Sequence, residues 1–217
     1  MNRRVYILVP GIRTRTDDNS GWAVAWADRI MQRYRETCPA ASEFRYFVGA
    51  LSRRLTQQRY ARQLAAMIEG WYDAGFSVVI ACHSNGADLL SRAMRLTSAH
   101  LEAVHLIAAA CDADMAQTGF LEAVQRGRLG RVVSYVSRSD SALGTWARLS
   151  RRWSFLGLGY GTLGIDGPQG VPAELRSRFP VVSRDYLEHG DWFDSRNIDQ
   201  TFAAVTVHER EHSPAMS

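Results

Sequence analysis

Hydrophobic and polar positions alternate with two different periods along this chain. Short apolar runs rich in β-branched residues predict strands at residues 5–9, 76–82, 104–110, 131–136 and 181–182, with a further candidate at 44–48. Between these runs, apolar residues recur every three or four positions, which predicts helices at residues 21–35, 53–71, 86–96, 120–126 and 197–211. Strands that alternate with helices are typical of an α/β fold with a mostly parallel sheet flanked by helices.

Composition adds limits to this picture. The 217 residues, of which 46% are hydrophobic and 22% charged, are typical of one globular domain spanning residues 1–217. All 26 basic residues are arginine, so lysine chemistry such as a Schiff base or a phosphate-loop lysine is excluded. The net charge is +4, but the arginines are scattered and no basic run exceeds a pair, so we expect no nucleic-acid partner.

The cysteines and the first residues indicate the cellular compartment in which the protein is expected. Cys38, Cys82 and Cys111 are an odd number without metal-ligand spacing, which predicts reduced thiols in a cytoplasmic protein. The apolar run that follows Arg4 stops at Pro10, too early for a secretion signal. No stretch approaches the roughly 20 apolar residues of a transmembrane helix, so we expect no integral membrane segment.

Ser84 lies where a predicted buried strand passes directly into a predicted helix. Residues 82–86 read Cys-His-Ser-Asn-Gly, which matches the G-x-S-x-G nucleophile elbow except that Cys82 replaces the first glycine. Small residues two positions before and after the serine let the strand and the helix pass closely. Ser84 is therefore the candidate nucleophile, and the alternative is that its hydroxyl only caps the following helix.

An activated serine needs a base and a carboxylate, which follow it in the order Ser, acid, His in this kind of arrangement. Asp140 comes just after the strand predicted at 131–136, at the sheet edge where catalytic groups gather, and is the first candidate for the acid. Asp112 and Asp114 follow the preceding strand and are the alternatives.

Among the histidines, His189 is the candidate base because it lies in a loop between the last predicted strand and the last predicted helix. His83 is adjacent to the serine and is expected to point elsewhere. His100 and His105 precede the candidate acid, which is the wrong order.

Two main-chain N–H groups are expected to stabilise an oxyanion. Asn85, the residue after the nucleophile, offers one. The turn at Pro10-Gly11 after the first strand places Ile12 to offer the other, and the alternative is an ordinary turn that ends the strand.

Taken together, these segments resemble the serine α/β-hydrolases, in particular a bacterial lipase- and esterase-like branch. The resemblance is carried by residues 82–86 and by residues 135–143, which fit the pattern Y-x-S-x-x-D-x-A-L and favour Asp140 over Asp112. It implies an α/β-hydrolase-like fold and a serine hydrolase acting on a small-molecule carboxylic ester or thioester through Ser84, His189 and Asp140. An acyltransferase with the same residues, or a non-catalytic protein of this fold, is the alternative.

Two further motifs are not expected to bind a metal or a cofactor. Residues 208–212 satisfy H-E-x-x-H but lie five residues from the C-terminus, with no chain left for a third zinc ligand. Residues 159–164 satisfy G-x-G-x-x-G, but this pattern binds a dinucleotide only where it follows a strand and opens a helix, and the glycines and Pro168 that follow predict no helix. They belong to the segment 144–172, which holds seven of the 17 glycines and is predicted to form a glycine- and aromatic-rich loop over the active site. The alternative is a surface loop that is packed by its own aromatic residues.

Overall fold

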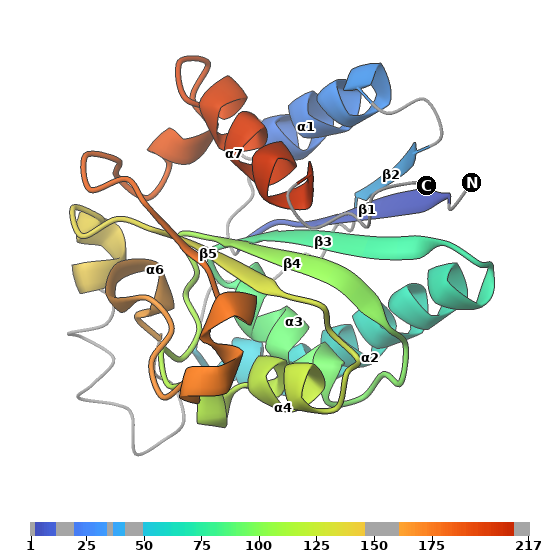
Figure 1. Cartoon of the computed structure of the whole chain (residues 1–217). Helices are drawn as coiled ribbons and strands as arrows, with labels where there is room; N and C mark the ends of the chain where they lie inside the picture. Colours follow the sequence, from blue (N-terminus) through green and yellow to red (C-terminus); the bar gives the residue numbers. More distant parts are fainter. Residues whose placement is uncertain (1–2, 12–19, 34–36, 42–49, 146–160, 211–217) are drawn as a thin grey trace.

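The alternating pattern folds into one sheet in which all neighbouring strands are parallel (Figure 1). The structure, a computed structural model, describes residues 3–11, 20–33, 37–41, 50–145 and 161–210. Within these ranges the strand order is β2-β1-β3-β4-β5-β6. The bounds are β1 Arg4–Val9, β2 Thr37–Ala41, β3 Ser77–His83, β4 Leu101–Ile107, β5 Val132–Val136 and β6 Val181–Ser183. The predicted α/β class is therefore confirmed.

Helices cover both faces of the sheet (Figure 1). One face carries α1 (Ser20–Arg33) and α7 (Ile198–Arg210), and the other carries α2 (Ala50–Asp73), α3 (Gly86–Met94) and α4 (Gly119–Gln125). Short helical turns are η1 (Met115–Gln117), α6 (Leu163–Asp166), η3 (Ala173–Arg178) and η4 (Asp191–Phe193).

Two apolar cores result from the twofold alternation of the strand side chains. Ile7 and Ile80 belong to the core shared with α2, α3 and α4. Their neighbours Leu8 and Val79 belong to the core shared with Trp26 of α1 and with α7. Strands buried on both faces explain why the predicted strands were nearly continuous apolar runs.

One strand was not predicted. β2 contains Pro39 and two alanines and no long apolar residue, so Thr37 is its one residue typical of strands. Proline is tolerated there because β2 lies at the edge of the sheet, beyond β1. The strand predicted at 44–48 lies outside the described residues.

The chain order around β1 creates a position for a site. β2 lies on one side of β1, and β3 to β6 follow one another on the other side, so the direction of winding reverses between β1 and β3. In open parallel sheets, ligands bind at the carboxyl ends of the strands beside this reversal. In the described parts of the chain, no helix combines the length and the apolarity that crossing a bilayer requires.

Candidate active site

Ser84 is held in a strained backbone conformation at the carboxyl end of the central strand β3. Its φ is 53°, a left-handed value that is costly for a residue other than glycine. The Ser84 N–H donates to the carbonyl of Ile107 at 3.1 Å, and the Ser84 carbonyl accepts from the N–H of Ala110 at 2.9 Å. These two bonds to β4 and the turn after it hold the strained residue, and α3 begins two residues later.

Close packing of strand and helix around this turn requires a small residue at position 86. A Cβ added to Gly86 would lie 2.6 Å from the Val9 carbonyl oxygen and 2.9 Å from that of Pro10. The start of α3 therefore lies directly against the end of β1. Cys82, which stands where the pattern has glycine, is fully buried, and burial raises the pKa of its thiol well above the usual value.

The turn after β1 lies against the serine. A Cβ added to Gly11 would be 2.8 Å from Ser84 Cβ and 3.3 Å from its Oγ. Ile12, the predicted second oxyanion donor, lies outside the described residues. Asn85, the first predicted donor, is the N-cap residue of α3, where main-chain N–H groups lack acceptors within the helix.

The structure brings Ser84, His189 and Asp140 together although they lie far apart in sequence. His189 Nε2 is 2.9 Å from Ser84 Oγ, and His189 Nδ1 is 2.7 Å from Asp140 Oδ2. Because a carboxylate only accepts hydrogen bonds, Nδ1 carries the proton and Nε2 accepts one from the serine hydroxyl. The hydroxyl of Ser84 is thus engaged by the imidazole, while Asn85 occupies the N-cap position of α3 and no side-chain cap bond forms there.

Asp140 is fixed by its own local structure. Its side chain is buried, and its second oxygen, Oδ1, accepts the N–H of Leu143 at 2.8 Å, which caps the helical turn at residues 141–145. The alternative acids make local bonds instead: Asp112 accepts the N–H of Asp114, and Asp114 caps η1.

Polar contacts join the loop that carries Asp140 to the loop that carries His189. The buried Ser137 hydroxyl donates to the carbonyl of Leu187. On the surface, Glu188 accepts both the N–H of Ser141, at 2.9 Å, and its hydroxyl, at 2.8 Å. These donors lower the pKa of the Glu188 carboxyl. The two loops are therefore linked by one residue before Asp140 in the sequence, Ser137, and by one after it, Ser141.

His83 lies closer to the site than the sequence indicated. The expectation that it points elsewhere is wrong: its Nε2 is 3.1 Å from the carbonyl oxygen of His189, and the two ring centroids are 4.9 Å apart. No sequence signal identifies this contact, because its acceptor is a main-chain carbonyl 106 residues further along the chain.

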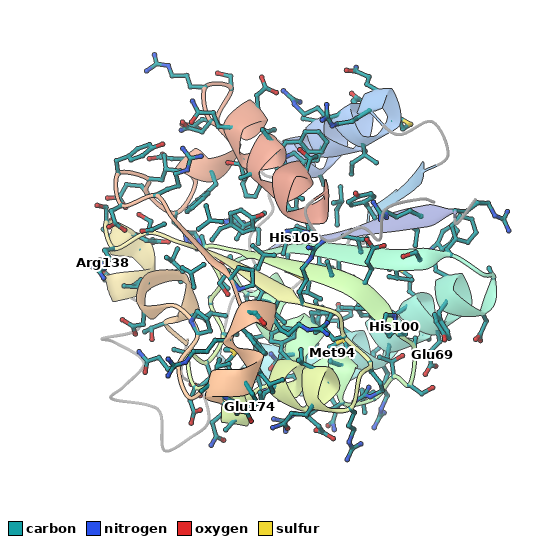
Figure 2. All side chains as sticks on the ribbon, in the orientation of Figure 1. Glu69, Met94, His100, His105, Arg138 and Glu174 are labelled. Atoms are coloured by element: carbon teal, nitrogen blue, oxygen red, sulfur yellow. The ribbon has the colours of Figure 1, made fainter. Side chains whose placement is uncertain are left out.

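The two histidines rejected on chain order lie away from Ser84. His100, labelled in Figure 2, lies just before the start of β4, at the amino ends of the parallel strands, whereas Ser84 lies at their carboxyl ends. His105 lies inside the sheet, fully buried, with its Nδ1 3.1 Å from the hydroxyl of Tyr135.

Of the glycine-rich segment 144–172, the structure describes residues 144–145 and 161–172. A Cβ at Gly161 or Gly164 would overlap main-chain atoms of residues 108–112, and Gly164 also accepts the N–H of Ser137 at 2.8 Å. This part therefore packs tightly against the turns after β4 and β5. It also contains α6, a single helical turn that begins at Leu163. The expectation that no helix starts at the G-x-G-x-x-G pattern is therefore wrong. Residues 146–160 and the end of the H-E-x-x-H motif lie outside the described residues.

Comparisons with known proteins identify the fold. No family model and no curated protein matches the sequence. Among solved structures, esterase PE8 is similar with a TM-score of 0.56 and 10% identity over 95% of this chain and 93% of that one. A predicted CIB-like hydrolase from Thermoplasma acidophilum has a TM-score of 0.54 and 13% identity over 97% and 87%. A serine hydrolase without a lid from Xanthomonas campestris has a TM-score of 0.54 and 15% identity over 100% and 86%.

These similarities define the class of protein by its fold. The chain has the α/β-hydrolase fold, as the sequence motifs led us to expect. These three structures that share the fold are esterases and other hydrolases. Their sequence identities to this chain, 10–15%, establish a common architecture and nothing more.

Proposed function

We propose that this protein is a serine hydrolase that cleaves a carboxylic ester or thioester. The observation that carries the proposal is the continuous series of hydrogen bonds from Ser84 Oγ to His189 and from His189 to Asp140. A hydroxyl bonded to an imidazole, which is itself held by a carboxylate, is the arrangement from which a serine attacks an acyl carbon.

In the first half of the proposed reaction, His189 Nε2 takes the hydroxyl proton as Ser84 Oγ attacks the acyl carbon. The tetrahedral intermediate collapses, the bond to the alcohol or thiol breaks, and His189 returns its proton to that leaving group. Asp140 keeps Nδ1 protonated throughout and stabilises the positive charge that the ring carries between the two transfers.

In the second half, a water molecule takes the place of the leaving group. His189 removes its proton, the water oxygen attacks the acyl carbon of the acyl-Ser84 ester, and collapse releases the carboxylic acid and restores the serine hydroxyl. Every proton transfer uses His189, so this reaction needs no metal or organic cofactor.

The negative charge of both intermediates falls on the former carbonyl oxygen. In the proposal, the N–H of Asn85 donates to this oxygen from the start of α3, whose N-terminal end attracts negative charge. Ile12 donates the second N–H. The close approach of Gly11, the residue before Ile12, to Ser84 supports this assignment.

A fluorophosphonate probe tests the proposal directly, because it forms a covalent bond with an activated serine and releases fluoride. The intact protein should be labelled at Ser84 and should hydrolyse short-chain aryl esters. Ser84→Ala should abolish both, whereas Ser98→Ala, a surface change before β4, should alter neither. An intact protein that is neither labelled nor active on esters and thioesters would favour a non-catalytic role. If added alcohols or amines take the acyl group in preference to water, the protein is an acyltransferase instead.

A further inference from the structure

His83 makes a directed contact with the main chain of the proposed base. Its Nε2 is 3.1 Å from the His189 carbonyl oxygen, and the two rings are tilted by 37°. Since a carbonyl only accepts, Nε2 is the protonated nitrogen of His83. The side chain therefore acts as a hydrogen-bond donor toward the backbone of His189, not toward its imidazole.

The surroundings of His83 hold the ring in this donor state. Trp22 of α1 and Phe193 of η4 pack edge-on against it at centroid distances of 6.4 and 4.9 Å, and the residue is 6% exposed. Burial, together with the positive charge that His189 can carry, lowers the pKa of His83 to about 3. At neutral pH the ring is uncharged, so it adds no positive charge beside the base.

The contact joins the two parts of the site whose relative position matters for the proposed reaction, namely the end of β3 beside Ser84 and the loop that carries His189. His83 is the last residue of β3 and immediately precedes Ser84. It pairs with Ile107 of β4, and its neighbour Cys82 pairs with Val9 of β1, so its position is fixed by the sheet. His189 lies in an exposed loop, and a Cβ added at the next residue, Gly190, would meet nothing within 4 Å. The loop has open space beside Gly190, and His83 holds it through the main-chain carbonyl of His189.

We propose that His83 is a positioning residue that holds His189 in reach of Ser84 through the His189 main-chain carbonyl. This inference rests on the proposed function. A misplacement of about 1 Å in a catalytic arrangement lowers the rate by about 100-fold. A hydrogen bond that fixes the distance of the His189 loop from Ser84 therefore has a measurable effect on turnover.

Two substitutions separate the donor from the bulk of the ring. His83→Gln keeps an N–H donor at a similar reach, whereas His83→Phe keeps the aromatic packing against Trp22 and Phe193 but has no donor. His100→Phe is the matched control, because His100 lies just before β4, at the end of the sheet opposite to Ser84. Each variant is compared with the intact protein by ester turnover, by the rate of fluorophosphonate labelling and by thermal unfolding.

We expect His83→Phe to lower kcat by about 10- to 100-fold with KM changed by less than about threefold, because the effect is on alignment. His83→Gln should retain kcat within about threefold, and His100→Phe should match the intact protein. A His83→Phe variant that is folded and fully active, or a His83→Gln variant as impaired as His83→Phe, overturns the inference.

A spectroscopic measurement keeps the inference testable apart from activity. Two-bond proton–nitrogen NMR spectra of the intact protein should show His83 as a neutral ring protonated at Nε2. Protonation at Nδ1 overturns the inference even if the enzyme is active. If the intact protein is neither labelled by the probe nor active on esters and thioesters, the proposed function fails, and the tautomer of His83 still decides whether the contact exists.

Discussion

The buried hydroxyl of Ser137 donates a hydrogen bond to the main-chain carbonyl of Leu187, 50 residues further along the chain. Ser137 follows β5 and precedes Asp140, whereas Leu187 follows β6 and precedes His189. This buried bond, together with the surface bonds from Ser141 to Glu188, links the loops that carry the proposed acid and base.

Ser137→Ala should lower the free energy of unfolding by about 1–3 kcal/mol, because the carbonyl of Leu187 would remain buried without its donor. Urea unfolding followed by tryptophan fluorescence measures this change. Ser139→Ala is the matched control, since its hydroxyl donates to the carbonyl of Asp185 at the exposed surface. An equal loss in the two variants would contradict the importance of burial here.

Asp140→Asn should lower kcat on the order of 10⁴-fold while the protein stays folded, because an amide at this position favours the wrong tautomer of His189. Steady-state kinetics with an aryl ester measures the change. Asp112→Asn should keep nearly full activity, since Asp112 makes only a local bond to the N–H of Asp114. A reversed result would assign the acid role to the turn after β4.

Gly86→Ala should destabilise the protein by at least about 1–3 kcal/mol, because the new Cβ would overlap the carbonyl oxygens of Val9 and Pro10, which are main-chain atoms that cannot turn aside. Gly70→Ala is the control within α2. Nothing lies within 4 Å of its added Cβ, so it should raise the free energy of unfolding by about 0.5–1 kcal/mol. Denaturant titration of both variants checks the predicted opposite signs.

The buried His83 predicts how stability changes with pH. Its pKa is about 3 in the folded protein against 6.5 for the free side chain, mainly because burial disfavours the charged ring. Below about pH 6.5 the unfolded chain binds a proton that the folded protein does not, so this residue lowers stability progressively as the pH falls toward 3.

The contribution reaches about 1.4 kcal/mol per pH unit well below pH 6.5. Urea unfolding of the intact protein and of His83→Phe between pH 7 and pH 4 isolates it, since phenylalanine does not titrate. The intact protein should lose stability more steeply, by the uptake of about one proton on unfolding. Parallel curves for the two proteins would contradict the lowered pKa.

Most strands and helices of the fold could be predicted from the sequence, because strands buried on both faces form continuous apolar runs. β1 and β3 are examples that the structure confirms. β2 could not be predicted, since its strand conformation depends on pairing with β1, and Pro39 and the two alanines that follow it have low strand preference. The helical turn α6 was also missed, because its packing against the turn after β4 is a tertiary effect.

The candidate site was predictable where chemistry and chain order coincide. Ser84, Asp140 and His189 each follow a strand, and the structure brings both Ser84 and Asp140 within hydrogen-bonding distance of the His189 ring. The contact of His83 could not be predicted in the same way. Its acceptor is a backbone atom, which leaves no pattern of residue types in the sequence.

The strand order has a consequence for how the chain folds. His189 lies 105 residues beyond Ser84 and 49 beyond Asp140, and its loop follows β6, the strand that pairs with β5 at the far edge of the sheet. Closing such long loops is slow, because chain entropy is lost before the contacts form. Because the loop of His189 follows β6, we expect the proposed nucleophile and base to meet once that strand has docked, so labelling at Ser84 would report a completely assembled sheet.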